Sequence, residues 1–525
     1  MVSEFDPLTI RFVAVAGSTE WVQDCQTALA PFSAPLMFAY LAVLFVVAIY
    51  GAHRYWLLFQ FGVRGRRVIR ERPVVASDQG TDWPRVTVQL PMFNEAPVAE
   101  RVIRSACAID YPRDRLQIQV LDDSTDEGAE IARRVCHELR AAGHDIEYRH
   151  RGHREGFKAG ALRDGLATAS GELIVIFDAD FVPPPDILRR VLPSFHDPEV
   201  GMVQTRWSHL NRDASWLTRS QAVFLDGHFV IEHTARFLNG RWIHFNGTAG
   251  VWRRVCIEDA GGWRSDTLTE DVDLSYRAQL RGWRFIYDPT MESPAELPPT
   301  IAAFQSQQHR WNKGSIQTAL KLMPSILRSR APIANKIEAW FHLTSPIIYL
   351  FVILMSLLFF PAFFVRIAPF ERGSATAWFF GLTIFGLATA SASTYFVVAQ
   401  WAQGRSVWRT IAQLPMLLAV GVGMSVGNSR AVIEALMRRA SPFIRTPKHS
   451  DQGRGTLDPA AVRRDRMTLP AGLIEIGLGA LMVACVGLAL ITPDGAWSIP
   501  FLLIFGAGYF LIGVGRIRES VRGVA

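Results

Sequence analysis

Five long apolar runs divide the chain, one near its beginning and four in its second half. They are Phe32–Ala52, Leu343–Val365, Thr376–Gln400, Pro470–Ile491 and Ser498–Gly515. A helix needs about 20 mostly apolar residues to cross a bilayer. Four runs contain no Asp, Glu, Lys or Arg, and the fifth contains only Glu475. The pattern predicts five transmembrane helices, in which Glu475 faces protein or water, or stays protonated against a neighbouring helix.

The polar middle segment, residues 53–332, alternates strand-like with helix-like stretches. The strand-like stretches are Val86–Leu90, Leu116–Leu121 and Leu173–Phe177, and the helix-like ones between them include Pro97–Ile109 and Glu127–Ala141. This alternation predicts an α/β domain with a mostly parallel sheet that helices cover on both faces. Ligands of such sheets bind at the carboxyl ends of the strands, so the residues that follow the strands are candidates for a functional site.

The basic residues around the apolar runs predict the orientation in the membrane. Six arginines follow the first run: Arg54, Arg64, Arg66, Arg67, Arg70 and Arg72. Basic loops favour the cytoplasmic side, so we place residues 1–31 outside and residues 53–332 in the cytoplasm. The residues before the first run are acidic with a single arginine, Arg11, and we therefore expect a retained span (32–52) rather than a signal peptide.

Residues 410–437 are a further apolar stretch, interrupted by Pro415 and by small residues. If this stretch crossed the membrane, the nine arginines and lysines between Arg430 and Arg466 would lie outside, against the orientation rule. We therefore predict an interface helix at 410–437. The C-terminal membrane region, 333–525, then keeps four spans and ends in the cytoplasm.

Composition narrows the classes of partner. The 525-residue chain is 49% hydrophobic and has a net charge of +7, but its basic residues flank the apolar runs instead of forming a groove with aromatic residues, so we expect no nucleic-acid partner. The five cysteines form no CxxC pair. We expect them to be reduced and structural, with no disulfide framework and no zinc site.

Two acidic motifs end two of the predicted strands. Asp122-Asp123 follows the second strand, and Asp178-Ala179-Asp180 follows the third. Magnesium and similar hard cations take carboxylate oxygens together with substrate phosphates, so Asp178 and Asp180 are candidate ligands of Mg²⁺ or Mn²⁺. Asp122 or Asp123 can accept hydrogen bonds from a base or ribose. The alternatives are a solvated turn for the later motif and helix capping for the earlier one.

Thr269-Glu270-Asp271 is a third acidic motif, and Asp271 is the candidate general base. A carboxylate opposite a leaving group can remove the proton of an attacking hydroxyl as the new bond forms. Glu270 and Asp273 are rival bases, and a capping acidic cluster before a helix is the structural alternative.

Two cationic motifs complete the set. Lys158 lies between glycines that let a backbone approach a diphosphate, although an ordinary surface lysine fits equally well. Gln307 and Arg310, three residues apart, share one helix face. Arg310 can stabilise a departing phosphate and Trp311 can stack on a sugar ring; a Trp-Arg pair at a membrane surface is the alternative.

The order of these motifs resembles that of membrane-embedded family-2 glycosyltransferases of the cellulose synthase superfamily. It is most similar to the cellulose-synthase-like A and C proteins, which are mannan and glucan synthases. The resemblance rests on Leu90–Glu95, Tyr148–Arg151, Arg154–Gly160, Phe245–Trp252, Gly261–Trp263 and Gln307–Trp311. It is strong between residues 84 and 324. It implies a GT-A-like nucleotide-sugar transferase domain joined to a helical transmembrane region.

The resemblance also implies roles for individual residues. Asp271 is the expected base, and Asp178 and Asp180 the expected metal ligands. The nucleotide sugar is expected at Glu95, Asp122, Asp123, Lys158, Asp178, Gln307 and Arg310. The acceptor is expected at Phe245, Asn246, Gly247, Thr248 and Trp311. A gating-type loop is expected within 441–455, at Phe443, Thr446 and Lys448, with Arg445 in place of the family's valine.

The activity implied is that of an inverting, processive β-glycosyltransferase in the inner (plasma) membrane, with a cytoplasmic catalytic domain. It is expected to polymerise a hexose through β-1,4 linkages and to export the glycan through its C-terminal spans. UDP-glucose is the favoured donor and GDP-mannose the second. A synthase that adds one sugar to ceramide or diacylglycerol is the alternative. A non-catalytic glycan-binding protein is disfavoured because every required acid is present, and a partner protein outside the membrane is left open.

Overall fold

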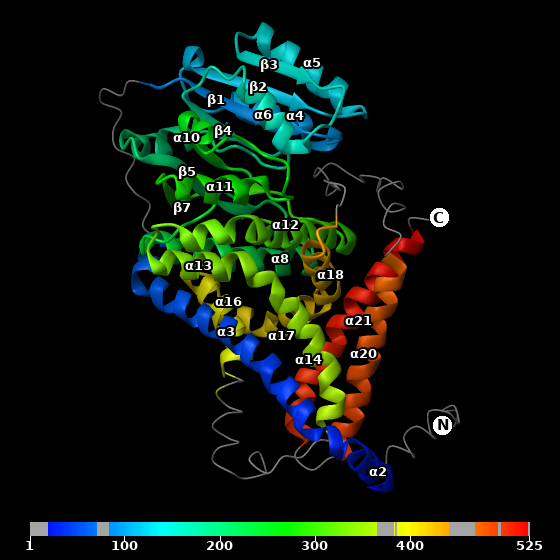
Figure 1. Ribbon diagram of the computed structural model, residues 1–525. Coiled ribbons are helices and arrows are strands. Elements are labelled where there is room, and N and C mark those ends of the chain that lie inside the picture. Colours follow the sequence, from blue (N-terminus) through cyan, green and yellow to red (C-terminus); the bar gives the residue numbers. More distant parts are fainter. Residues whose placement is uncertain are drawn as a thin grey trace.

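The computed structural model describes residues 19–70, 83–364, 383, 386–439, 468–491 and 495–522. A domain built on one β-sheet lies above a set of long helices (Figure 1). The sheet has the order β3-β2-β1-β4-β6-β5-β7. Its strands are β1 (Val86–Met92), β2 (Leu116–Asp122), β3 (Asp145–His150), β4 (Leu173–Ile176), β5 (Val200–His209), β6 (Gly250–Arg253) and β7 (Arg284–Ala295).

The sheet is mostly parallel, as predicted. β1 pairs in parallel with both β2 and β4, β2 with β3, and β5 with β7, while β6 runs antiparallel to its neighbours β4 and β5. The predicted strands at Val86, Leu116 and Leu173 correspond to β1, β2 and β4. The parallel pairing brings the ends of β1, β2 and β4, and therefore the acidic motifs that follow two of them, to one edge of the sheet.

Helices cover both faces of this sheet. One apolar core packs strand residues such as Val88 and Val120 against α4 (Ala96–Cys107) and α5 (Gly128–Ala141). The opposite core packs Ile174 and Trp252 against α6 (Phe157–Leu166), α10 (Arg254–Asp259) and α11 (Glu270–Leu280). Shorter elements complete the domain: η2 (Arg113–Arg115), α7 (Ile187–Val191), η3 (Leu192–His196), α8 (Trp216–Asp226), η4 (Gly227–His233) and α9 (Thr234–Leu238).

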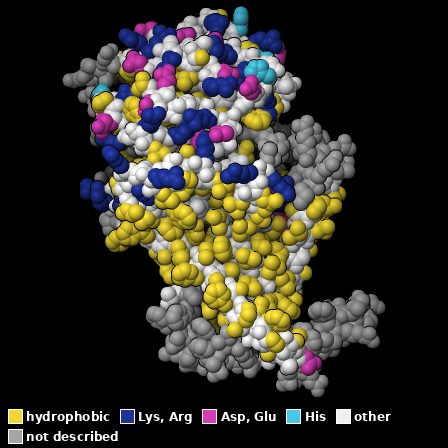
Figure 2. Space-filling model, viewed as in Figure 1, with side chains coloured by type: hydrophobic (Ala, Val, Ile, Leu, Met, Phe, Trp, Pro, Cys, Tyr) yellow, Lys and Arg dark blue, Asp and Glu magenta, His cyan; other side chains and the backbone are white. Residues whose placement is uncertain are grey.

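Long helices form the second part of the molecule, and apolar side chains cover most of its visible surface below a band of Lys and Arg (Figure 2). The helices are α2 (Thr19–Leu29), η1 (Ala30–Phe32), α3 (Ser33–Arg70), α12 (Ile301–Arg328), α13 (Ile333–Thr344), η5 (Ser345–Ile347), α14 (Ile348–Ala362), η7 (Gly386–Ala390), α16 (Ser391–Ala402), α17 (Val407–Gly423), α18 (Ser425–Leu436), α20 (Thr468–Ile491), η8 (Gly495–Ser498) and α21 (Ile499–Arg522). Backbone approach is close where α17 meets α21, because a Cβ on Gly508 would lie 2.2 Å from the Ala419 carbonyl oxygen.

Five helical segments of the described residues are long and apolar enough to cross a membrane. They are Asp24–Gly62, Ile333–Ala362, Val407–Leu436, Leu469–Ile491 and Ala496–Val521. Four overlap predicted spans. The predicted span 376–400 falls partly outside the described residues, and its described end lies in η7 and α16. α3 continues to Arg70, but its backbone is non-helical at Gly62 (φ 40°, ψ −148°), so a kink separates the membrane-type segment from the helical residues that follow it.

The ends of α18 and α21 are attached to α12, the helix that follows the last strand of the sheet. Glu519 of α21 accepts hydrogen bonds from the backbone N–H groups of Ile301 and Ala302, at 3.0 and 2.8 Å, and so caps the first turn of α12. In α18, Glu434 accepts from Lys313 of α12 at 3.0 Å. α12, which carries Gln307, Arg310 and Trp311, is therefore attached both to α18 and to the end of α21.

Glu475 of α20 is paired with Arg516 of α21, with a 2.9 Å contact between Nη2 and Oε1. Both side chains are buried. Truncating one member, as in Glu475→Leu, leaves an uncompensated buried charge and is expected to destabilise the protein by about 3–5 kcal/mol. Thermal unfolding in detergent measures this loss. The double variant Glu475→Leu/Arg516→Leu should recover most of the stability, and a double variant no more stable than the single one would argue against the pair.

Candidate active site

A cavity of about 170 Å³ lies at the edge of the sheet where β1 and β4 end. Its wall includes most of the side chains that the sequence singles out: Glu95, Asp123, Lys158, Asp178, Asp180, Asn246, Gly247, Asp271, Gln307, Arg310 and Trp311. These residues come from strand ends, from α6, from the loop before β6, from α11 and from α12. The fold thus brings segments more than 200 positions apart to one site.

Lys158 and Asp178 are in direct contact in this cavity. Lys158 Nζ donates to Asp178 Oδ1 at 2.5 Å and to the Gly247 carbonyl at 2.8 Å. Thr248 Oγ1 accepts a hydrogen bond from the backbone N–H of Asp178 at 2.9 Å, which fixes the turn after β4. Asp180 lies on the same wall. Two carboxylates on one turn form a donor set of the kind that hard divalent cations prefer.

Asp271 stands in the first turn of α11 and faces the cavity. Its Oδ1 accepts from the Val272 backbone N–H at 2.9 Å. Burial and the neighbouring Glu270 carboxylate raise the pKa of Asp271 to about 7, while Lys158 and backbone hydrogen bonds oppose the shift. A carboxylate with a pKa near neutrality can take a proton from a hydroxyl and release it to water afterwards.

The rival bases differ in their surroundings. Asp273 is fully buried and engaged in ion pairs with Arg277 at 2.8 Å and Lys321 at 2.7 Å, so it serves the packing of α11. Glu270 lines the cavity, but 92% of its surface is covered and burial raises its pKa. These contacts favour Asp271 over Asp273.

The raised pKa of Asp271 predicts the pH dependence of the reaction. The base acts only when it is deprotonated, so the rate should rise with pH up to about 7 and then level off. Initial rates at saturating donor, measured from about pH 5 to about pH 9 alongside donor binding, test this. A rate that stays constant through this range while binding is unchanged would contradict Asp271 as the titrating base.

The structure separates the neighbours Asp122 and Asp123. Asp123 lines the cavity, and its carboxylate accepts two hydrogen bonds from Arg151, at 2.7 and 2.6 Å. Asp122 lies outside the cavity wall that the described residues form. It is buried, and its oxygens accept from Tyr148 Oη at 2.7 Å and from the Ser124 N–H at 2.9 Å. Asp123 is therefore the one of the two aspartates that is open to a ligand in this cavity, while Asp122 holds the turn.

The predicted acceptor residues also divide into two groups. Asn246 and Gly247 face the cavity. Gly247 has a φ of 81°, and a Cβ there would lie 3.0 Å from Asp271 Oδ2, so glycine suits both the backbone and the space beside the base. Phe245 and Thr248 are fully buried and do not line the cavity that the described residues form, and the Phe245 ring packs against Trp252 with ring centroids 5.6 Å apart. Both side chains support the loop from the core, and their part in acceptor binding stays a prediction.

Arg310 and Trp311 lie side by side on α12. Burial lowers the pKa of Arg310 from its ordinary value, and the carboxylates of Glu270 and Asp178 oppose that shift. A guanidinium cation in this position can stabilise the negative charge that develops on a departing phosphate. The sequence assigned no role to Trp207 or Arg154, although both line the same cavity. The Arg154 guanidinium lies 3.3 Å from the centre of the Phe93 ring. In the sequence, the place of Arg154 at the start of the motif that contains Lys158 is the feature that could have indicated a role in the site.

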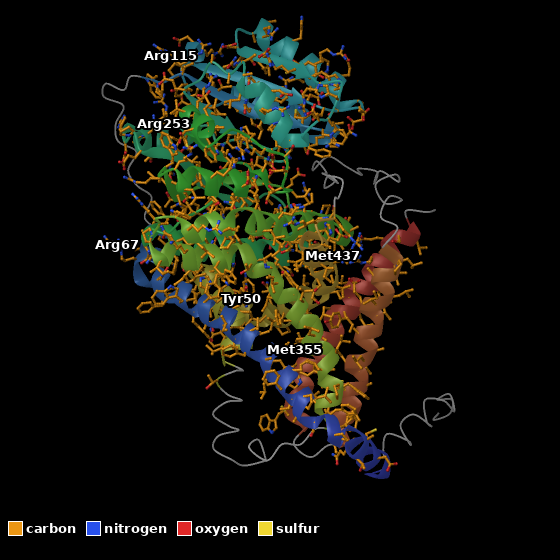
Figure 3. The ribbon with its side chains drawn as sticks, in the orientation of Figure 1. Tyr50, Arg67, Arg115, Arg253, Met355 and Met437 are labelled. Carbon is orange, nitrogen blue, oxygen red and sulfur yellow. The ribbon has the colours of Figure 1, made fainter. Side chains whose placement is uncertain are left out.

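A second cavity, of about 930 Å³, begins at the same residues and extends among the long helices. Asp271, Asn246, Gln307 and Trp311 line both cavities. The far wall is mostly apolar and is formed by residues of α3, α14, α17 and α21, among them Met37, Tyr40, Met355, Leu417 and Phe505. Figure 3 labels Met355, which lies on α14. The site therefore opens toward the membrane-type helices.

The predicted gating-type loop, with Phe443, Thr446 and Lys448, lies outside the described residues. The described chain before it ends at Arg439, just beyond α18. In α18, Glu434 accepts from His309 at 3.1 Å and from Lys313 at 3.0 Å. The chain entering the loop is therefore attached to the helix that carries Arg310.

Comparisons with known proteins agree with this geometry. The family description "Glycosyltransferase like family 2" matches residues 84–314. The rice (Oryza sativa subsp. japonica) "Probable glucomannan 4-beta-mannosyltransferase 11" is 43% identical over 290 residues, 52% of this chain and 51% of that protein. This alignment spans about half the length of that relative. The rice "Probable glucomannan 4-beta-mannosyltransferase 9" is 32% identical over 480 residues, 88% of this chain and 89% of that protein.

A solved structure shows the same fold. "Mannosyltransferase PcManGT from Pyrobaculum calidifontis in complex with GDP-Man and Mn2+" superposes with a TM-score of 0.51 at 22% identity, over 76% of this chain and 100% of that one. Fold, site and relatives together define a glycosyltransferase with a GT-A-like domain and a membrane-type helical region. The chain belongs to glycosyltransferase family 2, within the cellulose-synthase-like A group of the cellulose synthase superfamily. The predicted family, fold class and enzyme class are confirmed.

Proposed function

We propose that this protein is an inverting, processive β-1,4-mannosyltransferase that builds a mannan or glucomannan from a nucleotide sugar at a membrane. The observation that carries the proposal is the shared wall of the two cavities. The carboxylate of Asp271 and the ring of Trp311 lie where the polar cavity meets the larger one among the long helices. A donor on one side and a glycan end on the other would meet at the base.

GDP-mannose is the donor we propose, in place of UDP-glucose, which the sequence alone favours. The support comes from the relatives, which are named glucomannan 4-beta-mannosyltransferases and are up to 44% identical over alignments of 265 to 480 residues. Asp123 is the residue we place nearest the nucleoside, and Lys158, Gln307 and Arg310 are placed around the diphosphate.

Asp178 and Asp180 are the proposed ligands of Mg²⁺ or Mn²⁺. Both carboxylates line the donor cavity, and both are hard oxygen donors of the type these ions select. When bound, such an ion neutralises the charge of the diphosphate. Lys158, which already contacts Asp178, contributes a positive charge from the protein itself.

The chain's own residues account for the transfer as follows. Trp311 and Asn246 hold the glycan end so that one hydroxyl faces the anomeric carbon of the donor. Asp271 takes the hydroxyl proton as the new C–O bond forms on the face opposite the leaving group, which inverts the anomeric centre. The bond from the anomeric carbon to the diphosphate breaks, and Arg310 stabilises the charge that develops on the departing oxygen.

We place the catalytic domain in the cytoplasm, with export of the product, because six arginines follow the first predicted span. α2 lies at the end of the bundle away from the sheet (Figure 1), and the end of α21 contacts α12 through Glu519. Before α17, Gln400 of α16 donates to Asp226 of α8 at 2.8 Å, and after it Glu434 contacts Lys313 of α12. The contacts on both sides of α17 are thus with helices next to the sheet, which favours an interface position for Val407–Leu436 over a crossing. The membrane that we propose is the inner, or plasma, membrane.

A glycolipid synthase is the second candidate, and the apolar lining of the larger cavity favours it. Side chains such as Leu41, Val352 and Phe359 suit a lipid chain as well as a glycan. The deciding experiment supplies full-length protein in lipid with radiolabelled GDP-mannose or UDP-glucose. A polymer that stays in the aqueous phase and is cut by β-1,4-mannanase supports the proposal. Label extracted into organic solvent identifies the glycolipid synthase instead.

A further inference from the structure

Three histidines gather beneath the acceptor-side loop, outside the donor cavity. His228 and His233 belong to η4, and His244 lies just before Phe245. One ring nitrogen from each lies within 4.8 Å of the others. His233 and His244 are buried, while His228 and His244 also line the 930 Å³ cavity. The cluster is thus enclosed by protein on one side and reachable from the cavity on the other.

Two nitrogens of this cluster are unsatisfied. Among the described residues, nothing hydrogen-bonds to Nδ1 of His233 or to Nδ1 of His244, although both atoms are buried. Buried polar atoms are nearly always paired, and an unpaired one often marks an ion or water site.

Glu232 supports the third histidine in the way that carboxylates support metal-bound imidazoles. Its Oε2 lies 3.0 Å from His228 Nδ1. A carboxylate that accepts the Nδ1–H of a histidine leaves Nε2 to carry the lone pair for a ligand, which here requires Asn246 Oδ1, now 2.9 Å from Nε2, to move away.

We propose that His228, His233 and His244 bind a transition-metal ion of the Zn²⁺ class. This site is distinct from the proposed Mg²⁺ or Mn²⁺ site, because imidazole nitrogens select Zn²⁺, Cu²⁺ or Ni²⁺ whereas carboxylates select Mg²⁺ and Mn²⁺. Three imidazoles leave a fourth position for water, as in sites with an open coordination position. The sequence predicts no zinc site because its cysteines form no CxxC pair, whereas the site proposed here is made of histidines.

The position of Asn246 gives the ion an effect on catalysis. Its amide oxygen lies 2.9 Å from His228 Nε2, and its amide nitrogen lies 3.2 Å from His233 Nε2. Zn–N bonds of about 2.0–2.1 Å require the three nitrogens to move closer together. An ion bound to His228 Nε2 would break the contact of that nitrogen with Asn246 and shift Asn246, so we expect Zn²⁺ to inhibit use of the acceptor more than binding of the donor.

Metal binding itself is the test, and it does not depend on the proposed function. Tag-free full-length protein is stripped with a chelator, reloaded with Zn²⁺ in the presence of excess Mn²⁺, and its metal content is measured. Co²⁺ substitution supplies a visible d–d spectrum, and zinc-edge X-ray absorption of the unaltered protein counts its nitrogen ligands. The variants are His228→Gln, His233→Gln and His244→Gln. Controls are His342→Gln, whose ring stacks on His244 at 4.3 Å, the exposed His137→Gln, and Asp180→Asn.

We expect one equivalent of tightly held Zn²⁺, bound by nitrogen ligands, that each cluster variant loses and the three controls retain. Absence of retained Zn²⁺, or retention unchanged in the cluster variants, overturns the proposal. Loss of Zn²⁺ in Asp180→Asn also overturns it, because the ion would then occupy the carboxylate site. If a cluster variant fails to fold, the ligand count from X-ray absorption of the unaltered protein still decides.

Discussion

Replacing Asp271 by asparagine is expected to reduce sugar transfer by a factor of about 10²–10⁴, the usual contribution of a general base. The substitution keeps the size and polarity of the side chain but removes the proton acceptor from the wall shared by the two cavities. Donor binding should remain nearly unchanged, because the donor contacts proposed above lie on Lys158, Asp178 and Arg310. Transfer from radiolabelled donor and equilibrium binding of GDP-mannose measure the two effects separately.

Glu270→Gln is the matched control for this prediction, since it removes the adjacent carboxylate from the same turn of α11. Without the negative charge of Glu270, the pKa of Asp271 should fall, and the rise of activity with pH should move to lower pH. Asp271→Asn protein that retains more than a few per cent of the activity would show that another group is the base. Loss of activity only in Glu270→Gln would transfer the role to that residue.

Removal of one carboxylate of the proposed metal site is expected to have the second largest effect. Asp180→Asn should lower transfer by a factor of about 10²–10³, the cost typical of losing one electrostatic contact to developing charge. It should also raise the Mn²⁺ concentration that gives half-maximal activity. Chelation of the unaltered protein should abolish transfer, and added Mn²⁺ or Mg²⁺ should restore it. Activity is followed as a function of metal concentration.

A surface aspartate supplies the control. Asp110 is exposed and pairs with Arg189 at 2.7 Å, away from the cavity. Asp110→Asn should leave both the rate and the metal dependence unchanged. A chelator-resistant reaction, or an Asp180→Asn protein with normal metal dependence, would speak against a metal at Asp178 and Asp180.

The three strands that the sequence reveals are buried along their whole length. β1, β2 and β4 are continuous runs of buried residues in which Leu, Ile and Val predominate, with buried Thr or Gln between them in β1 and β2. β3 is an edge strand with polar positions, and β7 contains Pro289 and Pro294, so neither has a readable pattern. β6 has only four residues, and its antiparallel pairing depends on contacts made far along the chain.

The site was predictable by motif but not by side-chain direction. Asp122 and Asp123 are adjacent, and neighbouring residues at a strand end face opposite ways. The sequence therefore could not tell that Asp123 faces the cavity while Asp122 bonds to Tyr148. Phe245 presents the same difficulty, because a residue inside a matching motif can support the site from the core.

The histidine cluster shows a different limit. His228 and His233 are five residues apart, a spacing that does not place two side chains on one face of an α-helix. η4 is a π-helix, in which residues i and i+5 are joined by the backbone hydrogen bonds and lie close together. His244 then approaches from the other side of the loop. The spacing of the three histidines along the sequence therefore does not predict that they lie together.

Under the proposed function, the wall shared by the two cavities has a mechanical consequence for a growing polymer. A sugar added beside Asp271 would leave the new chain end in the place that the next donor must reach. The proposed synthase would then resume only after the product had moved one unit deeper among the helices. A bulky group on the chain end should therefore stop both bond formation and movement.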